Sequence, residues 1–139
     1  PKLEMNFDCP QLGFEATKKY WHILDNNTFH EKINNLAIGK EWENVKIGSN
    51  SDRFFNLCKP ALNKPCFTIT ESSSSSAASV MHPTIKRKLN LEEVRMLCTF
   101  PKDYDFLDIN AISVMGRSVQ PVMMANISNQ IYLQWLSKI

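Results

Sequence analysis

Glycine is scarce in this sequence, and its four residues lie too far apart for any Gly-x-Gly pattern. The Gly-rich turn that holds a cofactor on a Rossmann-like sheet is therefore missing. The four cysteines include no pair with the Cys-x2-Cys or Cys-x4-Cys spacing of a zinc site, and the three histidines supply no pair either. A net charge of +2 is too small to indicate by itself that the protein binds nucleic acid.

Long apolar runs are absent as well. None approaches the ~20 residues that span a bilayer, and no charged segment followed by an apolar stretch opens the sequence as in a secretory signal. We therefore expect a cytoplasmic protein without a membrane partner, its cysteines reduced and mostly buried. With 139 residues and 43% hydrophobic content, the chain is long enough to bury a core as one domain.

The first half of the chain carries few regular patterns. Residues 1–14 lack periodicity and are expected to be the trailing end of an upstream segment, whereas residues 15–24 carry an apolar stripe at helical spacing. Residues 28–64 are irregular and rich in Asn, Ser and Asp. Two apolar pieces within them are candidate strands, residues 44–47 and 53–57. Residues 66–70 predict a better strand, because aromatic and β-branched side chains alternate there.

A run of serines follows, within residues 71–79. Its composition is typical of a flexible linker, but small side chains also suit a loop that lets a backbone approach a partner closely. Three consecutive cations come shortly after it, at Lys86, Arg87 and Lys88. Such a triplet alone indicates a solvated turn, so its meaning depends on the motif beside it.

A first motif, at residues 87–101, predicts a helix with a well-defined start. Asn90 suits the N-cap, and Glu93 three residues later completes a capping-box-like pair, with Asn in place of the usual Ser or Thr. We expect the helix to end near Thr99, because Pro101 disfavours helical backbone at the residue before it.

A second motif, at residues 116–121, precedes a long helix predicted over residues 121–138. Pro121 suits the first helical position, and the free N–H groups of such a helix start attract anions and polar ligand groups. An ordinary loop leading into a helix would have the same pattern. Apolar residues recur every fourth position along the helix, which predicts core packing. The residues of this apolar stripe are Val119, Met123, Ile127, Ile131 and Trp135.

In this order, the two motifs resemble the ninth and tenth motifs of the cytosine-5 DNA methyltransferases. The ninth has the form Arg-x-Leu-Thr-x-x-Glu, followed by a short apolar helix and Phe-Pro. It is matched here by Arg87, Leu89, Glu93, Phe100 and Pro101, with Asn90 in place of Thr. The tenth has the form Gly-Asn-(Ser or Ala)-Val-x-Pro. It is matched by Gly116, Ser118, Val119 and Pro121, with Arg117 in place of Asn.

The resemblance implies an α+β fold: a small target-recognition domain of short strands with two to three helices. Its C-terminal helix would pack on a Rossmann-like catalytic domain that is absent from this chain. Residues 1–86 would form the target-recognition region, and residues 87–139 the motif region with the C-terminal helix.

In the family, a cysteine in an upstream Pro-Cys-Gln loop attacks C6 of a flipped cytosine, and S-adenosyl-L-methionine (AdoMet) supplies the methyl group to C5. Cys66 follows a proline but precedes Phe67, and no neighbouring residue offers a route to a lowered thiol pKa. We therefore expect Cys66 to be structural, and no catalytic residue in this chain.

By the same resemblance, the chain would bind double-stranded DNA and complete the AdoMet pocket. Its loop at residues 68–79 would face the major groove, where hydroxyl groups bond to base edges. The residues implied there are Thr68, Thr70, Ser72, Ser73, Ser74, Ser75 and Ser76. Phosphate contacts would come from Lys86, Arg87 and Lys88, although Arg87 can instead brace the recognition domain against the motif helix. The cofactor wall would comprise Arg117, Ser118 and Val119.

Such a chain can be an excised domain, a natural small subunit that needs an N-terminal catalytic portion, or a relic that binds DNA without catalysis. A rival class is a non-catalytic DNA-binding module whose functional surface is the Ser-rich loop with the basic triplet. A third class is a protein-interaction domain that docks on a partner through the apolar stripe.

Overall fold

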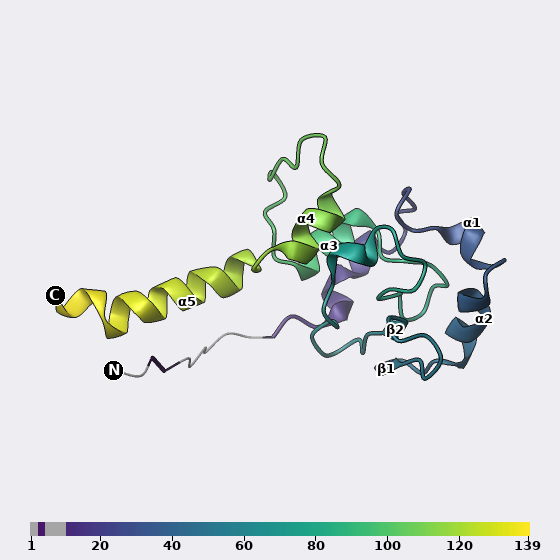
Figure 1. Cartoon of the computed structure of the whole chain (residues 1–139), viewed down its shortest axis with the longest axis horizontal. Helices are drawn as coiled ribbons and strands as arrows, with labels where there is room; N and C mark the ends of the chain where they lie inside the picture. Colours follow the sequence, from purple (N-terminus) through teal and green to yellow (C-terminus); the bar gives the residue numbers. More distant parts are fainter. Residues whose placement is uncertain (1–2, 5–10) are drawn as a thin grey trace.

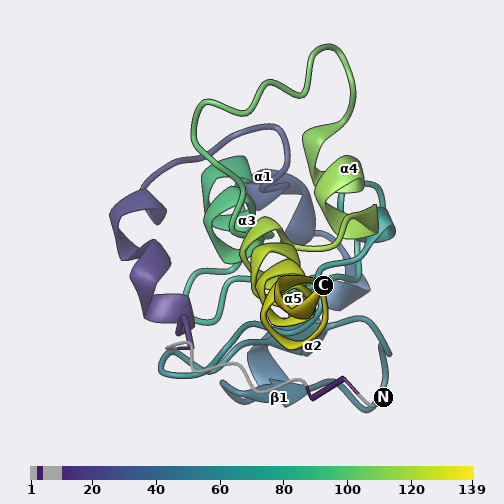
Figure 2. The same cartoon turned by 90° about the vertical axis from the view of Figure 1, so that its left-hand side faces the viewer.

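A long C-terminal helix stands away from a body of short helices and loops in the computed structural model of this chain (Figure 1). The structure describes residues 3, 4 and 11–139. Viewed along that helix, the other elements surround it in projection (Figure 2). The described part is α+β, with several helices and one small sheet, as the sequence predicted.

The described elements are short except for the last helix. The first half holds a 3-10 helix η1 (Phe14–Tyr20), helices α1 (His30–Ile33) and α2 (Ala37–Asn44), and strands β1 (Ser49–Asn50) and β2 (Cys58–Lys59). The second half holds a 3-10 helix η2 (Glu71–Ser73), helices α3 (Leu91–Leu97), α4 (Ala111–Arg117) and α5 (Pro121–Gln134), and a final 3-10 turn η3 (Leu136–Lys138). Strands β1 and β2 are antiparallel, with Asn50 opposite Cys58.

Two apolar clusters form the core, and β2 separates them. Cys58 and Val80, joined by a parallel bridge, belong to the first cluster. Their chain neighbours Leu57 and Met81 belong to the second, because successive side chains of an extended segment point to opposite sides. The first cluster is built around Phe14, Leu89, Val94, Ile112 and Met115. The second is built around Ile33, Ile38, Val45, Leu57 and Met81.

The predictions for the first half were mostly wrong in detail. The helix predicted over residues 15–24 is the 3-10 helix η1, which buries Phe14 and Thr17 and leaves Leu24 exposed. The strands are two residues long and lie beside the predicted pieces, while residues 66–70 form no strand. The expected trailing end at residues 1–14 lies largely outside the described residues. Such short elements carry too little periodicity for a sequence pattern to locate them.

The helix predicted after Asn90 is confirmed. The Asn90 side chain accepts a hydrogen bond from the Glu93 N–H, and the Glu93 carboxylate accepts one from the Asn90 N–H, which is the reciprocal capping box. Helix α3 then ends at Leu97, close to the predicted position. Helix α4 was not anticipated; it begins at an N-cap, Asn110, whose side chain accepts the Ser113 N–H.

The long final helix is confirmed, but its predicted core packing is wrong. None of the α5 residues is buried, and Val119, Met123 and Trp135 are 55%, 51% and 39% exposed. The pattern identified an apolar surface correctly. Its Ile127 and Ile131 are half-buried, and Glu4 is hydrogen-bonded to Gln134 near the end of α5. In the described residues, no helix has the length and apolar character needed to cross a membrane.

Candidate functional site

The centre of the first motif is a fully buried ion pair between Arg87 and Glu93. Two parallel hydrogen bonds join the guanidinium to the two carboxylate oxygens, at 2.8 and 2.7 Å. Both side chains are fully buried, and the guanidinium also donates to the main-chain oxygens of Lys88 and Trp21. A bidentate arginine pair of this kind fixes orientation as well as charge. Arg87 therefore connects the end of η1, the backbone at Lys88 and α3.

This placement decides between the two roles considered for Arg87. The side chain has no exposed surface, so in this structure it braces the chain at Trp21 against α3 and is not available to a DNA phosphate. Asn90 adds to the same bracing, because its side-chain amide donates to the oxygens of Tyr20 and Ile23. The sequence did not single out Asp25, whose carboxylate accepts the N–H of Leu91 at the start of α3.

His82 lies beside this ion pair and is held neutral. Its Nδ1 accepts the N–H groups of Thr84 and Ile85, so Nε2 carries the proton and lies 3.7 Å from the Glu93 carboxylate. The ring is fully buried and meets Trp21 edge-on at 4.6 Å. Burial, with the positive charge of Arg87 as a smaller cause, lowers the pKa of His82 from 6.5 to about 3.

Acid should destabilise the protein through His82. Its pKa is lower in the folded protein than in the unfolded chain, so this stabilisation is complete above pH 6.5 and is lost as the pH falls. The expected loss between pH 7 and pH 5 is about 2 kcal/mol, at roughly 1.4 kcal/mol per pH unit below the unfolded pKa. Urea unfolding at the two pH values measures it. A His82→Gln variant should lose less stability on acidification than the wild type. Replacing the exposed His22 should leave the pH dependence of the wild type. If the free energy of unfolding of His82→Gln falls with pH as steeply as that of the wild type, His82 is not the group responsible.

The Ser-rich loop is ordered and starts with its own cap. Thr70 and Ser73 form a reciprocal capping box around η2. Four of the predicted DNA-contacting residues are exposed, namely Thr68, Thr70, Ser72 and Ser75. Ser73, Ser74 and Ser76 are half-buried. The loop thus offers a row of hydroxyl groups to solvent, and it is not the unstructured linker that its composition also allowed.

Lys88 anchors this loop from beneath. Its ammonium group donates to the main-chain oxygens of Ser74 and Ser76, at 3.2 and 3.0 Å, and lies 4.9 Å from the centre of the Phe29 ring. The side chain is only 2% exposed, and burial lowers the pKa of Lys88 from 10.5 to about 8. The phosphate contact predicted for Lys88 would require the ammonium group to leave these partners, because in this conformation its charge is directed inward. Of the basic triplet, only Lys86 reaches the surface, where it pairs with Glu43 at 2.7 Å.

Replacing Lys88 by Met should loosen the Ser-rich loop with little change in global stability. The substitution removes two hydrogen bonds to the loop, each worth about 1 kcal/mol, but it also removes the cost of burying an ammonium group. Hydrogen–deuterium exchange should become faster at residues 74–78 while the urea midpoint changes little. The matched control is Lys86→Met, which removes a surface ion pair and should leave exchange in the loop unchanged. Slow exchange at residues 74–78 in Lys88→Met would show that the anchor lies elsewhere.

The second motif packs directly on the start of the Ser-rich loop. A Cβ added to Gly116 would lie 2.3 Å from the carbonyl carbon of Thr70 and 2.4 Å from the nitrogen of Glu71. Glycine is therefore required for α4 to approach η2 this closely. Arg117 forms an ion pair with Glu71 across the same contact. This pairing lowers the pKa of the Glu71 carboxyl, through the hydrogen bond from Arg117.

Ser118 and Val119 lie between α4 and α5, at the root of the projecting helix. The Ser118 hydroxyl donates to the oxygen of Val114, and the Val119 side chain is 55% exposed. Part of the helix start is already satisfied within the chain, because the Val122 N–H donates to the Thr99 hydroxyl. Arg117, by contrast, is paired with Glu71. The structure thus brings Arg117 to the Ser-rich loop instead of to the implied cofactor wall.

Cys66 has the opposite character from a nucleophile. Burial, followed by its proximity to the thiols of Cys98 and Cys58, raises the pKa of the Cys66 thiol to about 12, so it stays protonated at neutral pH. Cys58, Cys66 and Cys98 are free thiols; Cys9 lies outside the described residues. Among the described residues, no group of three or more His, Cys, Asp or Glu side chains is placed to hold a metal ion.

No family model, curated protein or solved structure matches the chain.

Proposed function

We propose that this chain is the C-terminal, target-recognition portion of an AdoMet-dependent DNA (cytosine-5-)-methyltransferase. The observation that carries the proposal is α5. This fourteen-residue helix contains no charged side chain and follows the second motif directly. A helix that is apolar without a charged face is normally buried, yet no residue of α5 is buried and most of its large apolar side chains are about half exposed. In the proposed enzyme, the catalytic domain covers α5.

The Ser-rich loop would supply DNA recognition. Hydroxyl groups at Thr68, Thr70, Ser72 and Ser75 are exposed on an ordered loop, and such groups donate and accept hydrogen bonds at base edges in the major groove. The loop is held by Lys88 from below and by α4 from the side. Recognition groups fixed in advance lose little conformational entropy on binding.

The residues present fit one wall of an AdoMet site. Val119 offers an exposed apolar side chain, and the Ser118 hydroxyl can still accept a hydrogen bond while donating to Val114. AdoMet, when bound, supplies the methyl group. In this proposal Ser118 and Val119 orient the cofactor's outer edge and exclude water from it, and the catalytic portion contributes the remaining walls and the cysteine nucleophile. Arg117 is left out of that wall, because it is paired with Glu71.

The second candidate is a non-catalytic DNA-binding module. It is favoured by the Ser-rich loop, whose anchors all lie within this chain and require no catalytic domain. Such a module predicts DNA binding that weakens steeply with salt and that AdoMet leaves unchanged.

The reading frame adjacent to the segment that encodes this chain separates the two candidates. The methyltransferase proposal expects a frame that encodes a Gly-rich cofactor turn and a Pro-Cys-Gln loop, either in the same chain or in a neighbouring one. If the adjacent frames encode neither, no catalytic nucleophile is available to the chain. The non-catalytic DNA-binding module then becomes the preferred function.

A further inference from the structure

Phe55 is held out into solvent by an ordered loop. Its side chain is 91% exposed, although burying a phenylalanine typically gains roughly 1.5–3 kcal/mol. The neighbouring Phe54 turns inward and packs against the second apolar cluster. Phe54 thus anchors the loop to the core, and Phe55 is exposed to solvent.

The loop is closed by hydrogen bonds and does not depend on Phe55 for its shape. The Ser51 N–H donates to the oxygen of Leu57 at 2.8 Å, which joins the two ends. Within the loop, the Ser51 hydroxyl accepts the N–H groups of Arg53 and Phe54 and donates to Glu41. Leu57 is fully buried and fixes the end of the loop to the core.

Phe55 and the Ser-rich loop line one hollow. This hollow has a volume of about 330 Å³, and its lining includes Cys58 and Val80. Asn50, Phe55 and Asn56 belong to the lining. So do Thr68, Thr70 and Ser73, which are among the residues predicted to read DNA. Two loops far apart in the sequence thus present amide, hydroxyl and aromatic groups to the same space.

We propose that residues 50–56 form a second DNA-reading loop, in which Phe55 and Asn56 contact an A·T base pair beside the bases that face the Ser-rich loop. This inference rests on the proposed function and names a specificity determinant within it. An exposed Asn side chain can make paired hydrogen bonds to N7 and N6 of adenine, and an aromatic side chain packs on the methyl group of thymine. Both groups lie at the edge of the hollow, on a loop that is already ordered.

The charge of this loop assigns it to base reading and not to backbone binding. Arg53 and Asp52 are its two charged residues, and both are exposed, so their charges offset each other. Phosphate contacts give salt-dependent affinity without sequence information, whereas base contacts give sequence preference. Loss of Phe55 should therefore change which sequence is preferred while the salt dependence of binding stays the same.

Selection from a duplex library with a randomised centre tests the proposal on the full chain. The wild type should enrich a consensus that contains an A·T pair, and Phe55→Ala should lose the preference at that pair. Affinity for the selected duplex should fall about tenfold, which corresponds to about 1.4 kcal/mol, with unchanged affinity for unselected duplex. Phe55→Ala should fold normally, since the side chain is exposed.

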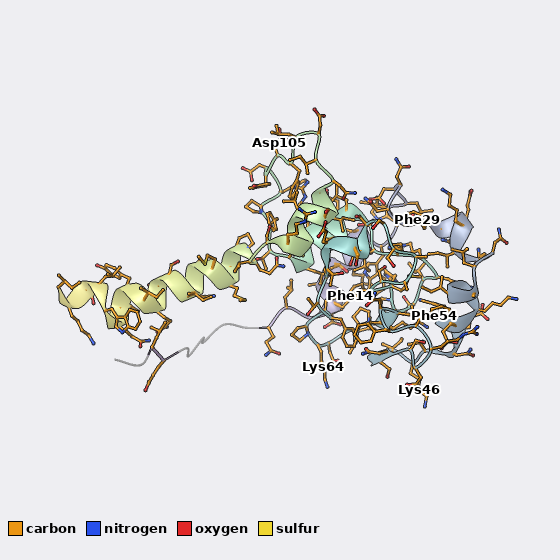
Figure 3. All side chains as sticks on the ribbon, viewed as in Figure 1. Phe14, Phe29, Lys46, Phe54, Lys64 and Asp105 are labelled. Carbon is orange, nitrogen blue, oxygen red and sulfur yellow. The ribbon has the colours of Figure 1, made fainter. Side chains whose placement is uncertain are left out.

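Leu107→Ala is the matched control. Leu107 is 78% exposed and belongs to the loop that holds Asp105, which lies far from Phe54 in Figure 3. Its replacement should leave the consensus and the affinity unchanged. As a second measurement, a photoreactive benzoylphenylalanine placed at position 55 should cross-link to the selected duplex, and one placed at position 107 should not.

The outcomes separate this inference from the proposed function. If the wild type enriches a consensus and Phe55→Ala enriches the same one, the second reading loop is wrong and DNA recognition by the Ser-rich loop stands. The same conclusion follows if Phe55→Ala changes only self-association of the chain. If the wild type enriches no consensus and binds no duplex, the proposed function fails, and the inference fails with it.

Discussion

Replacing Glu93 by Gln should destabilise the protein by about 3–5 kcal/mol, the range found when one partner of a buried ion pair is removed. The Arg87 guanidinium would stay buried opposite a neutral side chain that accepts only one of its two hydrogen bonds to the carboxylate. The same carboxylate accepts the Asn90 N–H and so caps α3. Urea unfolding at pH 7 measures the loss, which should be the largest of any polar substitution in the motif.

Two control variants show whether the cost comes from the uncompensated charge. Glu92→Gln changes the adjacent residue, whose carboxylate is partly exposed and 3.7 Å from Arg95, and should cost less than about 1 kcal/mol. The double variant Arg87→Met with Glu93→Leu removes both charges, and it should be more stable than Glu93→Gln despite two changes. If the double variant is the less stable of the two, hydrogen bonding and not charge burial dominates at this site.

Replacing Gly116 by Ala should separate α4 from the Ser-rich loop. The added methyl group would lie 2.3–2.5 Å from main-chain atoms of Thr70 and Glu71, and these cannot move aside as a flexible side chain would. Overpacking of this kind destabilises a protein by ~1–3 kcal/mol. The higher helix propensity of alanine offsets up to about 1 kcal/mol of this loss. Exchange of amide hydrogens in η2 should accelerate, and affinity for a selected DNA duplex should fall.

The control for Gly116 is its neighbour, Arg117→Ala. This change removes the ion pair to Glu71, in which both side chains are more than half exposed, so its effect on stability should be within about 1 kcal/mol. It leaves the close approach of α4 to η2 intact. Equal acceleration of exchange in both variants would mean that the ion pair, and not the glycine, holds the loop.

Local signals allowed some elements to be predicted from the sequence. Helix α3 was predicted because Asn90 and Glu93 carry the capping box within four residues, so no distant contact was needed. The long α5 was predicted because Pro121 marks its start and apolar residues recur at helical spacing. The capped start of α4 at Asn110 offered a similar signal, but only seven residues follow it.

No local sequence pattern predicts which residues of the basic triplet are buried. Lys86, Arg87 and Lys88 are equivalent as a sequence pattern, yet Arg87 and Lys88 are buried and Lys86 is not. Their partners are main-chain oxygens, which no sequence pattern marks. Arg87 donates to the oxygen of Trp21, and Lys88 donates to the oxygens of Ser74 and Ser76. The match of Glu93 to a family motif was the one available hint that Arg87 has an acidic partner.

The arrangement of the candidate site depends on contacts that the sequence does not contain in one place. The sequence identified the Ser-rich loop, and the structure adds that Gly116 and Arg117 fix its first turn. It assigned Arg117 to the cofactor wall, because the motif places it beside Ser118. The direction of that side chain depends on Glu71, which is distant in the sequence, and no pattern within the motif contains it.

The measurement that tests the central proposal most directly is methyl transfer by the reconstituted enzyme. The chain is mixed with the catalytic portion that the proposal expects in the adjacent reading frame, and incorporation of labelled methyl groups from AdoMet into duplex DNA is followed by nucleoside analysis. The account predicts 5-methylcytosine with the mixture and none with either part alone, and it predicts weaker transfer with the Gly116→Ala chain. A catalytic portion that methylates the same DNA site equally well without this chain would contradict the account.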